Sequence, residues 1–557
     1  MSLFLSPKPR GNHDIRATLP SRPLPLVAFL SLGVFGFGGG PALAADDDAI
    51  QKLSKAIERL EAQHQAELKQ LEDQINQLKA QQAQTEKQVQ AQAPGPTTPR
   101  LIESPTHQFG MTSPDGQNSI AILARLHFDA GDYIDTHPEG GAKGVGPGSA
   151  GHPLDSGVDA RRARLGIGGT FLGDWAYRLI YDFGSSADSV TTGVSGAVTS
   201  GVENAYVTFN GFYKPQNPVP VAVDLGYLDI PWTLDEATSS NDIMFLERSS
   251  SQVVATEFGG GDFRSGLGLR SNNQRYWVGA YVTGPQSGAP HTGANDGNFS
   301  TLGRAGYQIL QDDNGSLHLG ANVGHIFNSH VNSTTTTATS ISTVEGSASL
   351  ALSDRPELRV DPTVILNTGN MPAHSGTVAA AETAAAYGNF FSQGEYFHYT
   401  VNQVAHGINP SDGAADVASP DLNFNGGYVE ASYSFGGRRN YIPETGAYSG
   451  VIPEHPFSLS GEGWGALELA ARFSAIDLND KFTPGKAPHL TGGVDGGDQK
   501  GYDLGLNWYP NLNMRFMFDY IRTDVDKLFK PTTNGTASTT PSGAHVNAVA
   551  ARTQFVF

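Results

Sequence analysis

The sequence predicts an all-β protein, a transmembrane antiparallel β-barrel preceded by a short α-helical coiled coil. Two patterns along the chain predict this architecture. After Leu101 the sequence consists of short stretches in which apolar and polar residues alternate, and it ends on such a stretch at Phe557. Between Asp46 and Gln92, apolar residues instead recur three and four positions apart. Alternation is typical of strands with one apolar face, and the longer spacing is typical of helices with an apolar stripe.

Residues 1–44 have the features of a secretory signal peptide. Four cationic residues precede an apolar stretch over residues 24–37, and the small residues Ala42-Leu43-Ala44 follow it. This order of a basic region, an apolar core and a cleavage site predicts removal after Ala44 and export of the protein. The alternative is a membrane anchor, which would need a longer apolar core.

Residues 45–92 predict a periplasmic coiled coil. A narrow apolar stripe is separated by Gln, Glu and Lys and consists of Ile50, Leu53, Ile57, Leu60, Leu68, Leu71, Ile75 and Leu78. A stripe this narrow has to be covered by a partner helix, so we expect self-association. The alternative is a solvated spacer helix. Residues 93–109 begin with a proline-rich run that ends the helix and forms a stiff linker to a barrel over residues 110–557.

The composition narrows the possible functions. Glycine is abundant, with 67 residues, and charged residues make up only 16%, which suits strands joined by long polar loops. The net charge of −19 argues against a general nucleic-acid-binding protein, which would carry a basic excess. The chain has no cysteine, so it has neither disulfides nor a thiolate metal site.

The sequence predicts neither an enzyme nor a cofactor site. The run Gly146-Pro147-Gly148-Ser149-Ala150-Gly151 fits the dinucleotide-binding pattern of spaced glycines, but no strand leads into it and no helix follows. We interpret this run as a loop. The remaining short catalytic motifs that we sought, such as G-x-S-x-G and H-E-x-x-H, are absent.

The last strand separates a barrel from a secreted β-sandwich, which would show the same alternation with its apolar face turned inward. Val549, Ala551, Thr553, Phe555 and Phe557 share one face, and no polar tail follows. Soluble chains usually end in frayed, polar residues. This end resembles the amphipathic last strand of outer-membrane barrels, whose terminal Phe is read by the barrel insertion machinery.

Several motifs resemble the phosphate-selective porin O and P family. The stretches at residues 161–170 and 173–178 look like that family's second and third strands, and residues 238–249 resemble the entry to its constriction loop. Residues 465–474 and 504–511 match its late strands. The likeness covers about residues 110–557 and is weak over 285–420. It implies a trimeric barrel of sixteen strands in the outer membrane of a Gram-negative bacterium, in contact with its lipid.

The resemblance implies a water-filled channel for passive diffusion of small anions such as phosphate, or of other polar solutes. A structural barrel that tethers the outer membrane to the periplasmic wall through its coiled coil is the alternative. Many family members carry a Lys just before the proline of the segment that ends at Pro231, and this chain has Asp229 there. A carboxylate lowers the local potential, so Asp229 is a possible modulator of selectivity.

Strand parity predicts which charged residues line the channel. The anion pathway is expected to contain Arg125, Arg162, Arg164, Arg178, Arg552 and, at the inward loop, Arg248. Asp129 and Asp182 share that inner face, so each arginine could instead belong to an ion pair in the wall, for instance Arg178 with Asp182. Arg161 has outward parity, and we expect it at the rim.

Overall fold

The structure is a computed structural model, and its chain divides into two compact units, Met1–Pro94 and Gly95–Phe557, which are described separately. In the first unit it describes scattered residues between 51 and 77. In the second unit it describes residues 100–101, 109–138, 154–184, 201–212, 220–258, 263–286, 299–312, 314–327, 333–337, 340–344, 349–403, 420–461, 463–482, 492–527 and 543–557.

The described residues of the first unit are helical, as the spacing predicts. Leu60 is 67% exposed and Ile75 is 50% exposed. The coiled coil remains a prediction, and the signal peptide over residues 1–44 lies outside the described residues. No helix in the described part of the chain is long and apolar enough to cross a bilayer.

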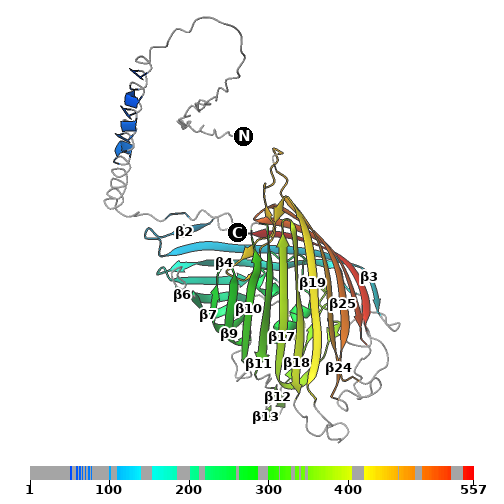
Figure 1. Cartoon of the computed structure of the whole chain (residues 1–557). Helices are drawn as coiled ribbons and strands as arrows, with labels where there is room; N and C mark the ends of the chain where they lie inside the picture. Colours follow the sequence, from blue (N-terminus) through cyan, green and yellow to red (C-terminus); the bar gives the residue numbers. More distant parts are fainter. Residues whose placement is uncertain are drawn as a thin grey trace, which may run out of the picture. The chain divides into compact units, whose positions relative to one another are not determined.

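The second unit is a closed antiparallel barrel of 16 strands, which confirms the predicted fold (Figure 1). It closes where the last strand pairs with the first, from Val556 opposite Arg125 to Ala544 opposite Pro138. The strands are β3 (Ser119–Pro138), β4 (Gly157–Phe171), β5 (Trp175–Asp182), β6 (Gly201–Phe212), β7 (Val221–Asp229), β8 (Phe263–Asn272), β9 (Tyr276–Gln286), β10 (Ser300–Gln311), β11 (Gly315–Ile326), β17 (Met371–Tyr387), β18 (Phe390–Gln403), β19 (Leu422–Phe435), β24 (Ala466–Asp480), β25 (Val494–Asn511), β26 (Met514–Asp526) and β27 (Ala544–Val556).

The two ends of the barrel differ in the length of their connections. At one end, the short-turn end, strands are joined by tight turns at residues 172–174, 273–275, 312–314, 388–389 and 512–513. At the other, the long-loop end, the connections run from 139 to 156, from 230 to 262 and from 327 to 370, among others. Outer-membrane barrels place short turns in the periplasm and long loops outside the cell, so this asymmetry assigns the two ends.

The faces of the strands alternate as predicted. On β3, Leu126 is 42% and Phe128 is 48% exposed on the outer face, whereas His127 and Asp129 are buried on the inner face. At the closing seam, the backbone N–H and C=O of Phe557 both pair with Ala124. The Phe557 ring also contacts the Phe109 ring, just before the short strand β2 (Gly110–Thr112), at 5.6 Å between centroids. β2 pairs in turn with β1 (Arg100–Leu101).

Three segments fold into the barrel and fill much of its interior. Residues 230–258 carry α2 (Leu234–Ala237) and α3 (Ser250–Glu257). Residues 349–370 carry β14 (Ser349–Leu350), β15 (Ser353–Asp354) and β16 (Leu366–Asn367), after a hairpin of β12 (Ser333–Thr337) and β13 (Ser340–Val344). Residues 436–465, at the short-turn end, carry β20 (Gly437–Arg438), β21 (Tyr441–Ile442), β22 (Ala447–Tyr448) and β23 (Ile452–Pro453).

These inward segments change the expected character of the inner face. We expected it to be polar and to line water. A cluster of buried apolar side chains instead joins the segments to the wall, and it includes Trp232, Phe258, Trp277, Phe397 and Phe424. The alternation predicts which side chains point inward, but inward side chains touch water only where no segment covers them.

The inward segment at the short-turn end, residues 436–465, is held to the wall through its backbone carbonyls. Arg304 on β10 donates to the carbonyls of Thr445 (2.9 Å) and Gly446 (2.7 Å), and the Trp277 indole donates to Glu444 at 3.0 Å. Gly446 adopts φ +64°, and a Cβ there would lie 2.7 Å from the Trp277 side chain. Both the left-handed backbone and the close approach require glycine at this position.

Candidate functional site

The candidate site lies where residues 238–248 of the first inward segment meet the wall formed by β27, β3 and β4. N-caps order the flanks of this stretch, because Thr233 accepts from the Glu236 amide before α2 and Ser249 accepts from the Gln252 amide before α3. The stretch between the helices consists of turns and bends, and it bonds with the wall.

Three arginines from the wall, and Arg439 from the inward segment at the short-turn end, donate to the backbone carbonyls of this stretch. Arg515 donates to Asn241 (3.1 Å) and Arg439 to Asp242 (2.6 Å). Arg552 donates to Leu246 (2.7 Å) and Arg472 to Glu247 (2.8 Å). Charged donors make strong hydrogen bonds, and several strands contribute them. The segment is therefore fixed to the wall rather than free to swing in the lumen.

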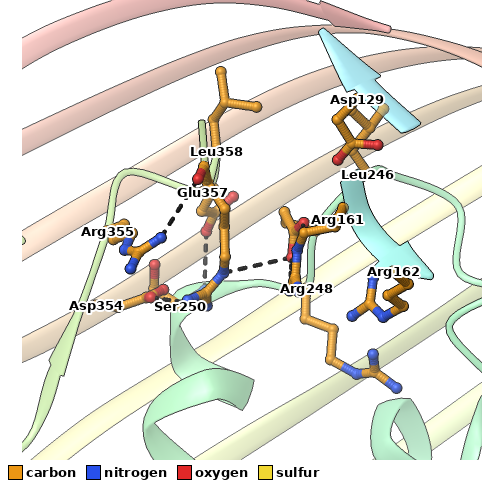
Figure 2. A network of polar contacts seen from close by, with 12 residues as sticks. Asp129, Arg161, Arg162, Leu246, Arg248, Ser250, Asp354, Arg355, Glu357 and Leu358 are labelled. Atoms are coloured by element: carbon orange, nitrogen blue, oxygen red, sulfur yellow. Dashed lines mark hydrogen bonds and ion pairs between the residues drawn. The ribbon is translucent and has the colours of Figure 1, made fainter. Parts of the chain in front are cut away.

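Glu247 is the centre of a buried ionic cluster, which we call the Glu247 cluster. Arg161 binds it through two nitrogens at 2.7 and 3.0 Å, Arg552 lies 3.2 Å away and Arg359 lies 3.4 Å away. Figure 2 shows Arg161 and Leu246 together beside Asp129. Burial alone would raise the pKa of Glu247, but Arg161 and Arg552 outweigh it and hold this pKa well below its usual value.

A second network joins the first inward segment to residues 349–370 (Figure 2). Glu357 accepts from the Ser250 amide at 3.1 Å and from Arg472 at 2.9 Å. Arg472 also lies 2.6 Å from Asp503 on β25. The Arg472 guanidinium binds both Glu357 from the loop and Asp503 from the wall. It also donates to the Glu247 carbonyl, so both inward segments are linked to the same strands.

Two of the predicted pathway arginines are engaged in ion pairs. Arg552 binds Asp129 through two hydrogen bonds of 2.7 Å each. Arg164 lies 3.0 Å from Asp182 and 2.7 Å from Glu203, and all three side chains are buried. For these arginines the alternative of a structural ion pair is the one that the structure shows. Their charge is balanced locally, so it attracts a passing solute less.

Two other predicted arginines contact water. Arg178 shares the inner parity of Asp182 on β5 and is exposed. The structure does not show the alternative pair of Arg178 with Asp182, and Asp182 is bound by Arg164 on the neighbouring strand. Arg125 is half-buried and donates to the hydroxyls of Ser240 (2.6 Å) and Ser239 (3.2 Å). Its bonds are to neutral groups, so its positive charge is not cancelled by them.

Arg162 lies between these residues, as predicted from its parity. Its Nη1 is 3.5 Å from His127 Nδ1, and His127 Nε2 is 3.0 Å from the Asn241 side chain. Arg162 is buried at 3% exposure. The structure therefore brings Arg125, Arg162 and Arg164 together on adjacent strands, with Arg125 directly opposite Arg164 and His127 opposite Arg162.

The expectation for Arg161 is wrong. It was placed at the rim by strict alternation, but it is buried at 3% and faces inward. The pairing of β3 with β4 shifts between His127 and Asp129, where β4 contributes one residue more than β3. Such a β-bulge reverses the parity of every residue beyond it. Arg161 and Arg162 therefore both lie on the inner side.

Arg248 and Asp229 lie close to the acidic residues Asp235 and Glu236 of the first inward segment. Arg248 donates to the carbonyls of Asp235 (3.0 Å) and Thr238 (2.8 Å), and its Nε lies 3.6 Å from the Asp235 carboxylate. Arg248 thus supports the loop, whereas Asp229 ends β7 and is exposed. Burial, and next the charge of Asp229, raise the pKa of Glu236 to about 8. Asp229 therefore contributes a negative potential at Glu236, and its role as a modulator of selectivity stays a prediction.

The sequence reasoning missed Glu247, Arg359 and Arg472. Glu247 and Arg359 lie in loops, where no periodic pattern assigns a side chain to a face. Arg472 could have been found, because it alternates with Leu469, Ala471 and Phe473 in a strand whose apolar face is clear. All three help to fix the inward segments.

Comparison with known proteins gives one family. A family model described as phosphate-selective porin O and P matches residues 142–557. Porin O of Pseudomonas aeruginosa is 25% identical over 382 residues, which cover 66% of this chain and 77% of that protein. Among solved structures, OmpT of Vibrio cholerae matches with a TM-score of 0.42 and 11% identity, covering 82% of this chain and 100% of that chain. An anion-selective porin from Comamonas acidovorans matches with a TM-score of 0.40 and 12% identity, covering 79% of this chain and 100% of that chain.

Proposed function

The chain belongs to the phosphate-selective porin O and P family of outer-membrane channels, and from that premise we propose that small anions, phosphate among them, cross it along the wall of β3, β4 and β5. The observation that carries this proposal is the uneven pairing of the inner charges. The inner acids Asp129, Asp182, Glu203 and Glu247 are each bound by arginine, whereas Arg178 is exposed and Arg125 is bonded to neutral hydroxyls. The solute therefore meets a net positive surface.

The spacing of these arginines suits conduction. Arg178 lies opposite Gly168, six residues along β4 from Arg162 and so about 20 Å from it. Arg125 and Arg164 lie between them. Several moderate sites in a row attract an anion without trapping it, and low-dielectric walls focus their field. Asp229 and its neighbours oppose this field, so we propose a modest anion preference rather than strict phosphate selectivity.

A reversal-potential measurement across a salt gradient in planar bilayers tests the proposal. The wild type should favour anions, and Arg178→Gln should shift the reversal potential toward cations. Arg522→Gln removes an exposed arginine from the outer face of the barrel and should leave the potential unchanged. If Arg178→Gln behaves like Arg522→Gln while both keep a heat-modifiable barrel, Arg178 does not lie on the anion pathway.

The alternative of a purely structural anchor is not favoured by membership of a porin family. Discrete conductance steps are the expected result with the purified protein, and their complete absence would favour the anchor instead.

We further propose that the protein is a homotrimer whose N-terminal helices associate in the periplasm. The apolar stripe from Ile50 to Leu78 supports this, because one helix buries it poorly alone. Cross-linking of the purified full-length protein should give trimers, and deletion of residues 46–92 should weaken them while the barrel stays folded. Only monomers in the full-length sample would contradict the proposal. Phe557, at the closing seam, is the proposed signal for the barrel insertion machinery.

A further inference from the structure

Asp242 lies where two inward segments meet inside the barrel. It belongs to the first inward segment, residues 230–258, and its side chain accepts a hydrogen bond from the backbone amide of Gly450 in the segment at the short-turn end. A Cβ at Gly450 would lie 2.9 Å from Asp242 Oδ1, so glycine lets the two segments approach this closely. Arg439 of the second of these segments donates to the Asp242 carbonyl at 2.6 Å. Segments from both ends of the barrel are therefore joined at Asp242.

This junction lies beside the proposed anion pathway. The hydroxyls of Ser239 and Ser240, just before Asp242 in the chain, accept hydrogen bonds from Arg125 on β3. The positive charge of Arg125 also acts on the Asp242 carboxylate. Asp242 itself is only half-buried. A solute that passes Arg125 therefore passes close to the Asp242 carboxylate as well.

The Asp242 carboxylate differs from the paired acids of the inner face. Arginines bind Asp129 and Asp182 directly. Within the part of the chain that the structure describes, Asp242 forms no ion pair, and its hydrogen bond is to a neutral amide. Asp229 hydrogen-bonds with Glu236 at the end of β7. Asp242 is therefore an acid beside the pathway whose charge no direct partner balances.

The surroundings of Asp242 make it easier to protonate. Three cations face it from three elements: Arg125 on β3, Arg515 on β26 and Arg439 at the short-turn end. Arg439 is paired with Glu468, and Arg515 donates to two backbone carbonyls. Burial raises the pKa of Asp242, and the backbone amide and the three arginines offset this only in part. Asp242 therefore takes up a proton at a higher pH than an ordinary aspartate.

We propose that Asp242 limits the anion preference of the channel, and that this preference strengthens when acid removes the charge of Asp242. The proposal rests on the anion pathway along β3, β4 and β5 proposed above. A carboxylate beside Arg125 weakens the attraction for anions, because the fields of the two charges subtract. Low-dielectric walls focus the remaining field on the passing ion. The junction that holds the two segments together thus also sets how strongly the channel selects by charge.

Reversal potentials in planar bilayers test the first part on the purified full-length protein. Asp242→Asn keeps the oxygen that accepts from Gly450 and removes the charge. It should raise the permeability ratio of chloride to potassium about three- to tenfold at pH 7. The control Asp498→Asn removes a carboxylate from the outer face of the barrel and should leave the ratio unchanged. Both variants should keep a heat-modifiable barrel, and a wild-type ratio in Asp242→Asn would overturn the proposal.

Acidification tests the second part on the wild-type protein itself. As pH falls from 7 to 4, the ratio of the wild type should rise toward that of Asp242→Asn at pH 7, because the carboxylate is protonated. The ratio of Asp242→Asn should change less over the same range. A wild-type ratio that does not depend on pH, or equal changes in the two proteins, would overturn this part.

The proposed anion pathway can fail separately from this inference. If Arg178→Gln leaves the reversal potential unchanged, the pathway does not follow β5. The comparison of Asp242→Asn with the wild type would still report whether the solute passes Asp242. If instead Arg178→Gln shifts the potential and Asp242→Asn does not, the pathway stands and the role of Asp242 is wrong.

Discussion

The walls formed by β24–β27 and by β3–β6 face the same lumen and differ in what covers them. In the first wall the inner charged side chains, such as Glu468, Arg472, Asp503 and Asp519, are between 0% and 6% exposed. In the second, Asp129, Arg162 and Asp182 are buried as well, but Arg125 is half-buried and Arg178 is exposed. The inward segments lie against the first wall and leave part of the second in contact with water.

The two walls differ in function: one holds the inward segments in place, and the other presents charges to the solute. A wall covered by loops holds those loops through buried ion pairs, and its charges cancel locally. A wall in contact with water keeps charges that a solute can meet. Substitutions in the first wall should therefore change stability, and substitutions in the second should change ion selectivity.

The largest effect is expected for Arg472→Met in the covered wall. It leaves the buried carboxylates of Asp503 and Glu357 without their cation and removes the stacking of Arg472 on Phe245, 4.6 Å from the ring centroid. Breaking a buried pair from one side costs about 3 to 5 kcal/mol. Urea unfolding of the purified barrel measures the loss. Arg125→Met, the matched change in the water-contacting wall, should cost less than about 1 kcal/mol and shift the reversal potential instead.

A smaller loss of stability is expected for Glu247→Gln. Arg552 keeps Asp129 and Arg359 keeps Asp354, whereas Arg161 loses its two hydrogen bonds to Glu247, and we expect a loss of about 2 to 3 kcal/mol at neutral pH. The pKa of Glu247 is lowered in the folded state, so its contribution is complete above the unfolded pKa and is lost as pH falls through the folded one.

Thermal unfolding measured between pH 7 and pH 3 tests this. The wild type should lose stability relative to Glu247→Gln as the pH falls below about 4.5. Parallel pH profiles of the two proteins would show that Glu247 is not held ionised by the arginines.

An effect of opposite sign is expected for Glu236→Gln. Burial and Asp229 raise the pKa of Glu236 to about 8, so the folded state keeps a proton that the unfolded state loses above about pH 4.5. The wild type should therefore lose stability as pH rises from about 4.5 to 8. The variant should be close to the wild type in stability at pH 4 and more stable at pH 9, by up to about 5 kcal/mol for a pKa raised from about 4.5 to about 8. A difference that does not grow with pH would contradict the raised pKa.

The sequence predicted the strands well because alternation is a local property. The outer faces of β3 and β27 follow from residues that are neighbours in the chain. The inner parity of Arg162, Arg164 and Arg552 was right for the same reason. What these side chains contact depends on other strands, and so the pairing of Arg164 with Asp182 and Glu203 could not be read from one strand.

Two kinds of error have different physical causes. Arg161 was misplaced by a single inserted residue on β4, which alternation does not reveal until the neighbouring strand is known. Glu247 and Arg359 were missed because loops have no period. The inward packing of residues 349–370 and 436–465 lies in the same class, since burial there comes from tertiary contacts rather than from a pattern.

The position of Glu247 has a consequence for the order of assembly. Its carboxylate contacts Arg161 on β4, the second strand of the barrel, and Arg552 on β27, the last strand. These two strands flank β3, and the pairing of β27 with β3 closes the cylinder. The loop that carries Glu247 leaves and rejoins the wall at the long-loop end, so it can enter the lumen through that open end, but the cluster is complete only when β27 has paired with β3. The Glu247 cluster then links β27 to β4 across the closing seam, on the inner side of the wall. Completion of the cluster therefore requires closure of the wall, because a barrel in which β27 has not docked lacks the ion pair between Arg552 and Glu247.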